Sequence, residues 1–200
     1  MTDERVAGVV LAAGLSTRMG RNKMLLQLGG RSLVRRAVET ALAAQLDPVL
    51  TVVGHERERV EAELQGLRCI PVPNPEYAEG MNTSLRAGIR ALPPEASGAV
   101  VLLGDMPLVG SAMLRALVET FRRARSPLII STYDGIVAPP ILYGRALFDE
   151  LRALAAEACG KGIVHAHRAE AIELSWPKEA LTDLDAPEDL ARVRARLEAA

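Results

Sequence analysis

The chain has 200 residues, 49% of them hydrophobic, which is enough to bury a sizeable core in one domain. Its 24 Lys and Arg residues nearly balance 25 Asp and Glu, and a net charge of −1 argues against a surface dedicated to the nucleic-acid backbone. Two cysteines, Cys69 and Cys159, are too few and too far apart for a disulfide framework or a structural zinc site. The first apolar run breaks at Gly14, too early to span a membrane, so we expect a cytoplasmic protein with no membrane or nucleic-acid partner.

Apolar runs of strand length alternate along the chain with segments of helical spacing. In chain order we expect strand Val6–Ala12, helix Ser32–Gln45, strand Val49–Val53, helix Glu56–Leu64, strand Arg68–Val72, helix Thr83–Leu92, strand Ala99–Leu103, helix Ser111–Ala124, strand Leu128–Thr132, helix Arg145–Ala156, strand Ala171–Leu174 and helix Glu188–Ala200. Ser32 is the expected N-cap of the first helix, and Tyr133–Gly144 is expected to be an irregular excursion. Most of the strands are continuously apolar, which is typical of parallel sheets covered on both faces. The pattern therefore predicts an α/β fold, a three-layer α/β/α sandwich around a mostly parallel sheet.

The first predicted strand runs into a glycine loop, Leu11–Lys23, with the sequence LAAGLSTRMGRNK. Small residues let backbone N–H groups approach phosphate oxygens, while Arg18 and Lys23 supply positive charge. Five residues separate Gly14 from Gly20, and neither a Walker loop nor the dinucleotide fingerprint has this spacing. A structural strand-to-helix turn with ordinary surface cations is the alternative. The arrangement of Arg, Gly and Lys favours a phosphate loop of a different kind.

Two later segments also carry candidate ligand-binding residues. The segment NPEYAEGMNTSLRAG places Asn82, Thr83 and Ser84 at a helix start, where N–H groups and hydroxyls can hold a base, ribose or phosphate. Simple helix capping by Asn82 or Thr83 is the alternative. In VVLLGDMPLV, Asp105 follows a buried strand, where its carboxylate can either coordinate Mg²⁺ bridging a triphosphate or cap the next turn.

These motifs resemble those of the molybdenum cofactor nucleotidyltransferases, the MobA-like NTP transferases of the wider pyrophosphorylase-like superfamily. LAAGLSTRMGRNK is similar to the signature loop of that family, GMNTSL to its G-M-x-x-S-L motif, and Asp105 to its metal-binding Asp. The resemblance implies a Rossmann-like fold of the nucleotide-diphospho-sugar transferase type. It also implies a single nucleotidyltransferase domain over residues 1–200, with nucleotide bound by about 1–108 and acceptor by about 109–200.

The resemblance carries over to individual positions. It implies nucleotide binding by Leu11, Ala12, Ala13, Gly14, Ser16, Arg18, Lys23, Gly80, Met81 and Ser84. It implies catalytic roles for Arg18, Lys23 and Asp105, with Asp105 as the metal ligand. The Ala12-Ala13 pair resembles members that use CTP, whereas GTP users typically carry two glycines there.

The acceptor half matches the family less well. Asp183 and Asp185 resemble an acidic pair near the acceptor or metal, but Asp185 with Glu188 also makes a good capping box. The segments APPILY and CGKGI depart from the family patterns at the corresponding places. His165 and His167 would diverge by about 200° on a helix and have no evident third ligand, which argues against a metal pair.

The implied reaction transfers CMP from CTP to the phosphate of molybdopterin, with release of pyrophosphate and Mg²⁺ as the cofactor, although an oxygen-rich site would also accept Mn²⁺. Charge neutralisation by Arg18, Lys23 and the metal suffices, because the acceptor phosphate is already ionised and needs no general base. A molybdoenzyme apoprotein is a candidate partner. Two alternatives stay open: the same chemistry on a phosphosugar or methylerythritol phosphate, and an accessory protein that binds and delivers the cofactor without catalysis.

Overall fold

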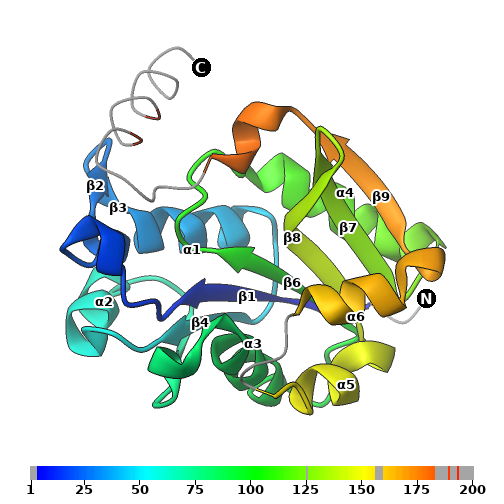
Figure 1. Cartoon of the computed structure of the whole chain (residues 1–200), viewed down its shortest axis with the longest axis horizontal. Helices are drawn as coiled ribbons and strands as arrows, with labels where there is room; N and C mark the ends of the chain where they lie inside the picture. Colours follow the sequence, from blue (N-terminus) through cyan, green and yellow to red (C-terminus); the bar gives the residue numbers. More distant parts are fainter. Residues whose placement is uncertain (1–3, 125, 156–159, 183–188, 190–192, 194–200) are drawn as a thin grey trace.

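The computed structural model describes residues 4–124, 126–155, 160–182, 189 and 193 (Figure 1). Its strands are β1 (Val6–Ala12), β2 (Gln27–Leu28), β3 (Arg31–Ser32), β4 (Val49–Val53), β5 (Ile70–Pro73), β6 (Gly98–Leu103), β7 (Leu128–Tyr133), β8 (Ile136–Gly144) and β9 (Ile172–Trp176). Its α-helices are α1 (Leu33–Ala43), α2 (Arg57–Glu63), α3 (Met81–Arg90), α4 (Ser111–Ala124), α5 (Phe148–Arg152) and α6 (Lys161–Ala166). Seven strands form one sheet in the order β5-β4-β1-β6-β8-β7-β9, and β2 and β3 form a separate hairpin.

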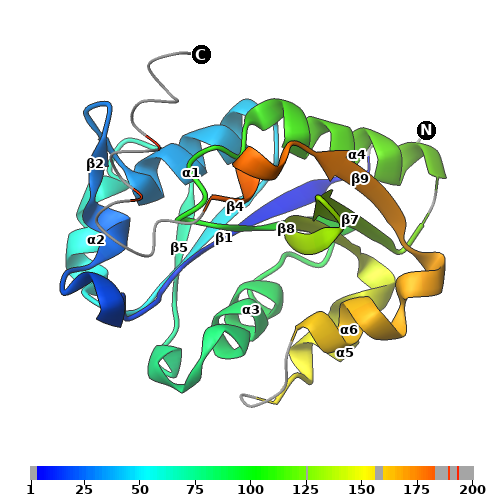
Figure 2. The ribbon, with the colours of Figure 1, turned by 45° about the horizontal axis from the view of Figure 1, so that its top comes forward.

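The sheet is covered by helices on both faces, as the continuous apolar strands predict. Figure 2 shows α1 and α4 on one side of the sheet and α3, α5 and α6 on the other. Every ladder of the sheet is parallel except those that β8 makes with β6 and β7. The predicted α/β sandwich with a mostly parallel sheet is therefore confirmed.

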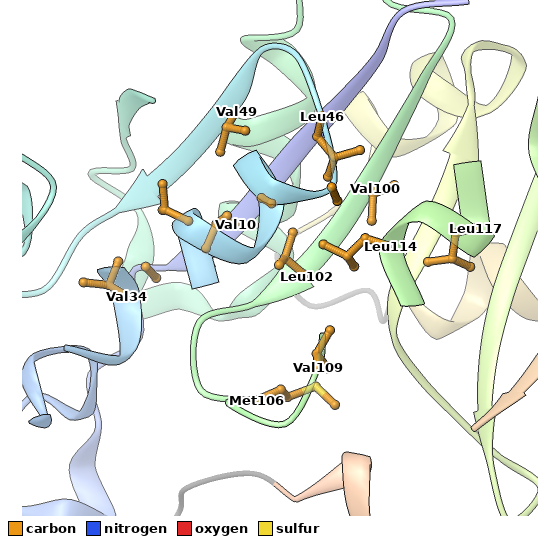
Figure 3. Packing of buried hydrophobic residues seen from close by; sticks show 14 of the residues in the cluster. Val10, Val34, Leu46, Val49, Val100, Leu102, Met106, Val109, Leu114 and Leu117 are labelled. Carbon is orange, nitrogen blue, oxygen red and sulfur yellow. The ribbon is translucent and has the colours of Figure 1, made fainter. Parts of the chain in front are cut away.

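Alternate side chains of β1 enter two different apolar clusters, because successive strand residues point to opposite faces. Val10 packs with α1 and α4 in the cluster that Figure 3 shows, whereas Val9 packs on the opposite face with α3. Both valines are fully buried. The cap predicted for α1 is also present, since the Ser32 hydroxyl accepts a hydrogen bond from the Arg35 N–H at 3.4 Å.

The prediction that Tyr133–Gly144 is irregular is wrong, because most of this segment forms β8 between β6 and β7. Prolines usually exclude a central strand, since they cannot donate to the ladder. Here a shift in the β7–β8 register between Ile130 and Ser131 accommodates Pro139 and Pro140. The Ser131 hydroxyl and the Tyr133 phenol then donate to the carbonyls of Pro140 and Pro139, at 2.6 and 2.8 Å.

Other differences from the expected elements are smaller. The helix expected from Arg145 is a short 3-10 turn followed by the five-residue α5, and α6 was not predicted. The expected C-terminal helix lies almost wholly outside the described residues, with only 189 and 193 described. Cys69 is a half-buried free thiol whose pKa is raised by burial. Within the described ranges no helix is both long and apolar enough to cross a membrane.

Candidate functional site

The glycine loop, Leu11–Lys23, leaves the carboxyl end of β1 and folds back on itself. Its closure depends on Ser16, whose hydroxyl accepts the Lys23 N–H at 3.0 Å and whose carbonyl accepts the Met19 N–H at 3.0 Å. Ser16 and Gly20 both have left-handed backbones, with φ of 55° and 63°, which turn the chain sharply. Ser16 therefore shapes the loop through its oxygen atoms, a role that the sequence did not suggest.

Two hydrogen bonds tie this loop to the end of β4, and one uses a residue that the sequence analysis missed. His55 donates its N–H to the carbonyl of Ala13 at 3.2 Å. Asn22, 3% exposed, donates its amide to the carbonyl of His55 at 3.0 Å and accepts the Met24 N–H at 3.0 Å. Both ends of the loop are thus fixed to His55, and Lys23 follows directly after the anchored Asn22.

Lys23 and Asp105 form an ion pair across the end of β1. Their side chains are 16% and 12% exposed, so the pair is largely withdrawn from solvent. Electrostatic interactions are stronger in such a poorly solvated environment than in water. Asp105 is held there by Gly104, whose N–H donates to the carbonyl of Leu11 at 3.0 Å. A Cβ atom at Gly104 would lie 2.7 Å from the sulfur of Met24, so the Met24 side chain would have to shift to admit any larger residue.

The start of α3 forms a second cluster, in which Asn74 contacts two residues that the sequence assigned either to ligand binding or to capping. Asn74 donates to the hydroxyls of Thr83 at 2.9 Å and Ser84 at 3.0 Å, and all three side chains are buried. Thr83 donates in turn to the carbonyl of Gly80 at 2.8 Å. The alternative of simple capping by Thr83 requires a bond from a free N–H group, but among the described residues its hydroxyl donates to carbonyls instead.

This cluster and the glycine loop are attached to the same strand end. The Asn74 N–H donates to the carbonyl of Val53, the last residue of β4, at 2.8 Å, and His55 follows two residues later. Asn82 does not cap α3 but accepts the Gly160 N–H at 3.0 Å, which links the start of α3 to the α6 segment. Met81, at 62% exposed, is one of the most accessible large apolar side chains.

The remaining predicted residues are placed as follows. Leu11, Ala12 and Ala13 are buried at the end of β1, and Gly14 is exposed. Arg18 lies in the short 3-10 turn Thr17–Met19, but its side chain is not described. Asp183 and Asp185 lie outside the described residues.

A hollow of about 780 Å³ opens between the glycine loop and the start of α2. Its walls are Leu15–Thr17, Gly20–Asn22, Leu25–Gln27, His55, Glu56 and Arg59. Among the predicted nucleotide-binding residues whose side chains are described, Ser16 alone lines it, and Lys23 and Asp105 do not. The Lys23–Asp105 ion pair is therefore not part of the lining of this hollow.

The C-terminal half of the chain contains a cluster of charged residues beside α6. His167 contacts Glu150 of α5 at 2.8 Å and Glu170 at 3.3 Å. The hydrogen bond to Glu150, supported by the one to Glu170, raises the pKa of His167 above its ordinary value. His167 thus links α5 to the segment after α6. Among the described residues, no group of three His, Cys, Asp or Glu side chains is placed so that it could hold a metal ion.

Comparison with known proteins identifies the relatives of this architecture. The chain is 29% identical over 204 residues to the purine catabolism protein PucB of Bacillus subtilis, covering 97% of this chain and 98% of that one. It is 36% identical over 151 residues to the bifunctional protein GlmU of Rhodococcus opacus, a match that covers 70% of this chain. The chain spans 30% of the length of that GlmU protein.

Solved structures resemble it over nearly the whole chain. Rv0371c from Mycobacterium tuberculosis superposes with a TM-score of 0.85 at 28% identity, covering 97% of this chain and 100% of that one. The complex of Rv0371c with manganese gives a TM-score of 0.78 at 27% identity, covering 96% and 98%. The molybdopterin-guanine dinucleotide biosynthesis protein A of Archaeoglobus fulgidus shares the fold, with a TM-score of 0.73 at 20% identity and coverage of 97% and 100%.

The family described as MobA-like NTP transferase domain matches residues 8–171, which include the glycine loop, the start of α3 and Asp105. The chain therefore belongs to the family of MobA-like NTP transferase domains.

Proposed function

We propose that this protein is a cytoplasmic nucleotidyltransferase that transfers CMP from CTP to the phosphate of molybdopterin and releases pyrophosphate. The observation that carries the proposal is the Lys23–Asp105 pair, held at the end of β1 by a closed loop. A fixed, poorly solvated ammonium group stabilises the charge on phosphate oxygens without reorganising during the reaction. Arg18, in the same loop, is assigned to the same triphosphate by resemblance.

A divalent cation fits the carboxylate of Asp105. Mg²⁺ is commonly held by one or two protein carboxylates together with substrate phosphates and water, so a single buried Asp next to a phosphate loop is a sufficient protein contribution. When bound, the cation supplies charge neutralisation for the phosphate oxygens. The manganese complex of Rv0371c supports a divalent metal in this family, and we assign Mg²⁺ here.

The reaction forms one P–O bond and breaks another. An oxygen of the acceptor phosphate attacks the α-phosphorus of CTP, and pyrophosphate leaves on the opposite side. The protein's part is to position the two phosphates and to neutralise their charge with Lys23 and Arg18. The attacking oxygen is already ionised near neutral pH, so no side chain has to remove a proton from it.

Nucleotide and acceptor are assigned on separate grounds. The Ala12-Ala13 pair, at 1% and 2% exposed, resembles the CTP-using members and supports CTP. We assign Leu11, Gly14, Ser16, Gly80, Met81 and Ser84 to the rest of the nucleotide, and Asp183 and Asp185 to the acceptor side. The shared fold of the molybdopterin-guanine dinucleotide biosynthesis protein A of Archaeoglobus fulgidus supports a molybdopterin acceptor, and a molybdoenzyme apoprotein would then receive the product.

The test is pyrophosphate release by the purified protein with Mg²⁺, molybdopterin, and CTP, GTP, ATP or UTP in turn. We expect release with CTP, reduced on the order of 100-fold or more in Lys23→Ala and in Asp105→Asn. Lys178→Ala is the matched control, because Lys178 also pairs with an aspartate, Asp134, but both side chains are about two-thirds exposed, at 68% and 70%. Near-normal turnover in Lys23→Ala would refute the assigned role.

The same assay separates the alternatives. Release that requires a phosphosugar or methylerythritol phosphate in place of molybdopterin would replace the acceptor and keep the chemistry. Tight cofactor binding without pyrophosphate release from any nucleotide would instead indicate a delivery protein.

A further inference from the structure

The hydroxyl of Ser84 is the starting point, because it is buried and its oxygen accepts a hydrogen bond while its own hydrogen is not accounted for. Ser84 is 5% exposed, and its oxygen accepts a hydrogen bond from the Asn74 amide at 3.0 Å. Within the described part of the chain no group accepts the hydrogen of this hydroxyl. Buried polar hydrogens are nearly always paired with protein, ligand or ordered water, so this one is available to a partner from outside the chain.

The direction of these hydrogen bonds is fixed by their neighbours. The Asn74 carbonyl oxygen accepts the Glu76 N–H at 3.0 Å, and since a backbone N–H can only donate, the amide cannot be flipped. Its NH₂ group therefore donates to both Thr83 and Ser84. Thr83 has carbonyl acceptors for its own hydrogen, at Glu76 and Gly80. Thr83 and Ser84 both accept a hydrogen bond from Asn74, but only the hydrogen of the Ser84 hydroxyl has no acceptor among the described residues.

Ser84 lies on α3 near the carboxyl ends of the central strands, where the nucleotide is proposed to bind. Four residues along α3, Gly88 rests on Val9 of β1 and Val52 of β4, with its Cβ position 2.4 and 3.1 Å from their side chains. Ser84 is one helical turn nearer the start of α3, which places it toward the carboxyl ends of these strands. Those ends carry the glycine loop.

We propose that Asn74 is a positioning residue that holds the Ser84 hydroxyl as a hydrogen-bond donor to an acceptor atom of the nucleotide base. This inference rests on the proposed function. The groups that contact the Ser84 hydroxyl in this cluster are neutral. The charged residues Lys23 and Asp105 are instead assigned to the phosphates and to the metal ion. An uncharged part of the nucleotide with a carbonyl oxygen or ring nitrogen, such as cytosine, fits the donor.

The experiment is a double-mutant cycle read by equilibrium binding of CTP with Mg²⁺ in the absence of acceptor. Ser84→Ala should raise the Kd by roughly 2- to 12-fold, the range for one neutral hydrogen bond. Asn74→Asp replaces the NH₂ group that donates to Ser84 by a carboxylate oxygen that can only accept. The Ser84 hydroxyl should then donate to residue 74 instead of to the nucleotide, so the Kd for CTP should rise by a similar factor. In the Ser84→Ala background, Asn74→Asp should add less than about 2-fold, because it acts only through the hydroxyl.

Two controls separate positioning from general damage. Thr83→Val removes the other hydroxyl that Asn74 contacts and should lower the thermal midpoint with a smaller effect on the Kd than Asn74→Asp. Where Asn74→Asp does not fold, Asn74→Ala replaces it in the cycle. With 2′-deoxy-CTP the loss caused by Ser84→Ala should be unchanged if the hydroxyl contacts the base.

Three results would overturn the inference: an unchanged Kd in Ser84→Ala, multiplicative effects of the two substitutions, or a loss that disappears with 2′-deoxy-CTP. Each of these leaves the proposed function standing as long as Lys23→Ala abolishes pyrophosphate release. Conversely, coupled losses of CTP binding in a protein that transfers nothing would support the positioning role and refute only the activity.

Discussion

Replacing Gly88 by Ala is expected to destabilise the protein, although alanine is the better helix former. Gly88 lies inside α3, and its Cβ position is 2.4 Å from Val9 Cγ1 and 3.1 Å from Val52 Cγ2. Carbon atoms pack favourably at about 3.5–4.0 Å, so the new methyl group would overlap Val9 by about 1 Å. Neither valine can move aside easily, since both are fully buried in the centre of the sheet.

The expected size follows from two opposing effects. Overfilling a packed core costs about 1–3 kcal/mol, and the fixed surroundings place this site near the upper end. The higher helix propensity of alanine returns about 1 kcal/mol. We expect a net loss of about 2 kcal/mol in the free energy of unfolding, which for a chain of this size lowers the thermal midpoint by about 4–8 °C.

Gly162→Ala is the matched control, because Gly162 also lies in a helix, α6, but has no atom within 4 Å of its Cβ position. It should raise the stability by about 0.5–1 kcal/mol. Both variants are measured by thermal and urea unfolding, together with the Kd for CTP, which should rise in Gly88→Ala because α3 also carries Ser84. A thermal midpoint for Gly88→Ala equal to or above that of the wild type would refute the packing argument.

Two further predictions concern the loop anchor and the C-terminal half of the chain. Asn22→Ala removes the hydrogen bonds to His55 and from Met24, and should lower the free energy of unfolding by about 1–3 kcal/mol and also lower kcat. The control Gln27→Ala, at an exposed neighbouring position, should change neither quantity. A normal kcat in Asn22→Ala would show that the anchor does not position Lys23. For His167 the pKa is raised in the folded state, so its contribution is fully present below pH 6.5, the ordinary pKa, and is lost as the pH rises through the folded value. The difference in thermal midpoint between wild type and His167→Gln should accordingly shrink as the pH is raised above 6.5, and a difference independent of pH would contradict the role of Glu150 and Glu170.

Much of the fold could be predicted from local patterns. The bounds of β1 and β4 follow from continuous apolar runs that end in glycine or small polar residues, and the cap of α1 from a serine before an amphipathic segment. The segment around Pro139 and Pro140 was misjudged, because local rules exclude prolines from central strands. The register shift that admits them depends on β7, a different part of the sequence.

The candidate site divides in the same way. Lys23, Asp105 and Ser84 could be named from motifs, because loop glycines and strand-end acids have a recognisable spacing. Asn22 and Asn74 could not, since a single asparagine carries no periodic signal and its importance comes from partners such as His55, 33 residues away. The sequence also assigned Lys23 and Asp105 to separate tasks, and only the folded chain shows that they form one ion pair.

By itself, then, the sequence determined the alternation of strands and helices, the two-sided burial of the sheet and the residue types able to meet a triphosphate. These depend on neighbours along the chain, through apolar periodicity, turn geometry and capping. The tertiary structure decided which loop ends are tied to His55, how β8 enters the sheet, and that the Ser84 oxygen accepts a hydrogen bond from Asn74. Those features depend on hydrogen bonds between residues far apart in sequence, whose geometry exists only after the strands have paired and the helices have packed on them.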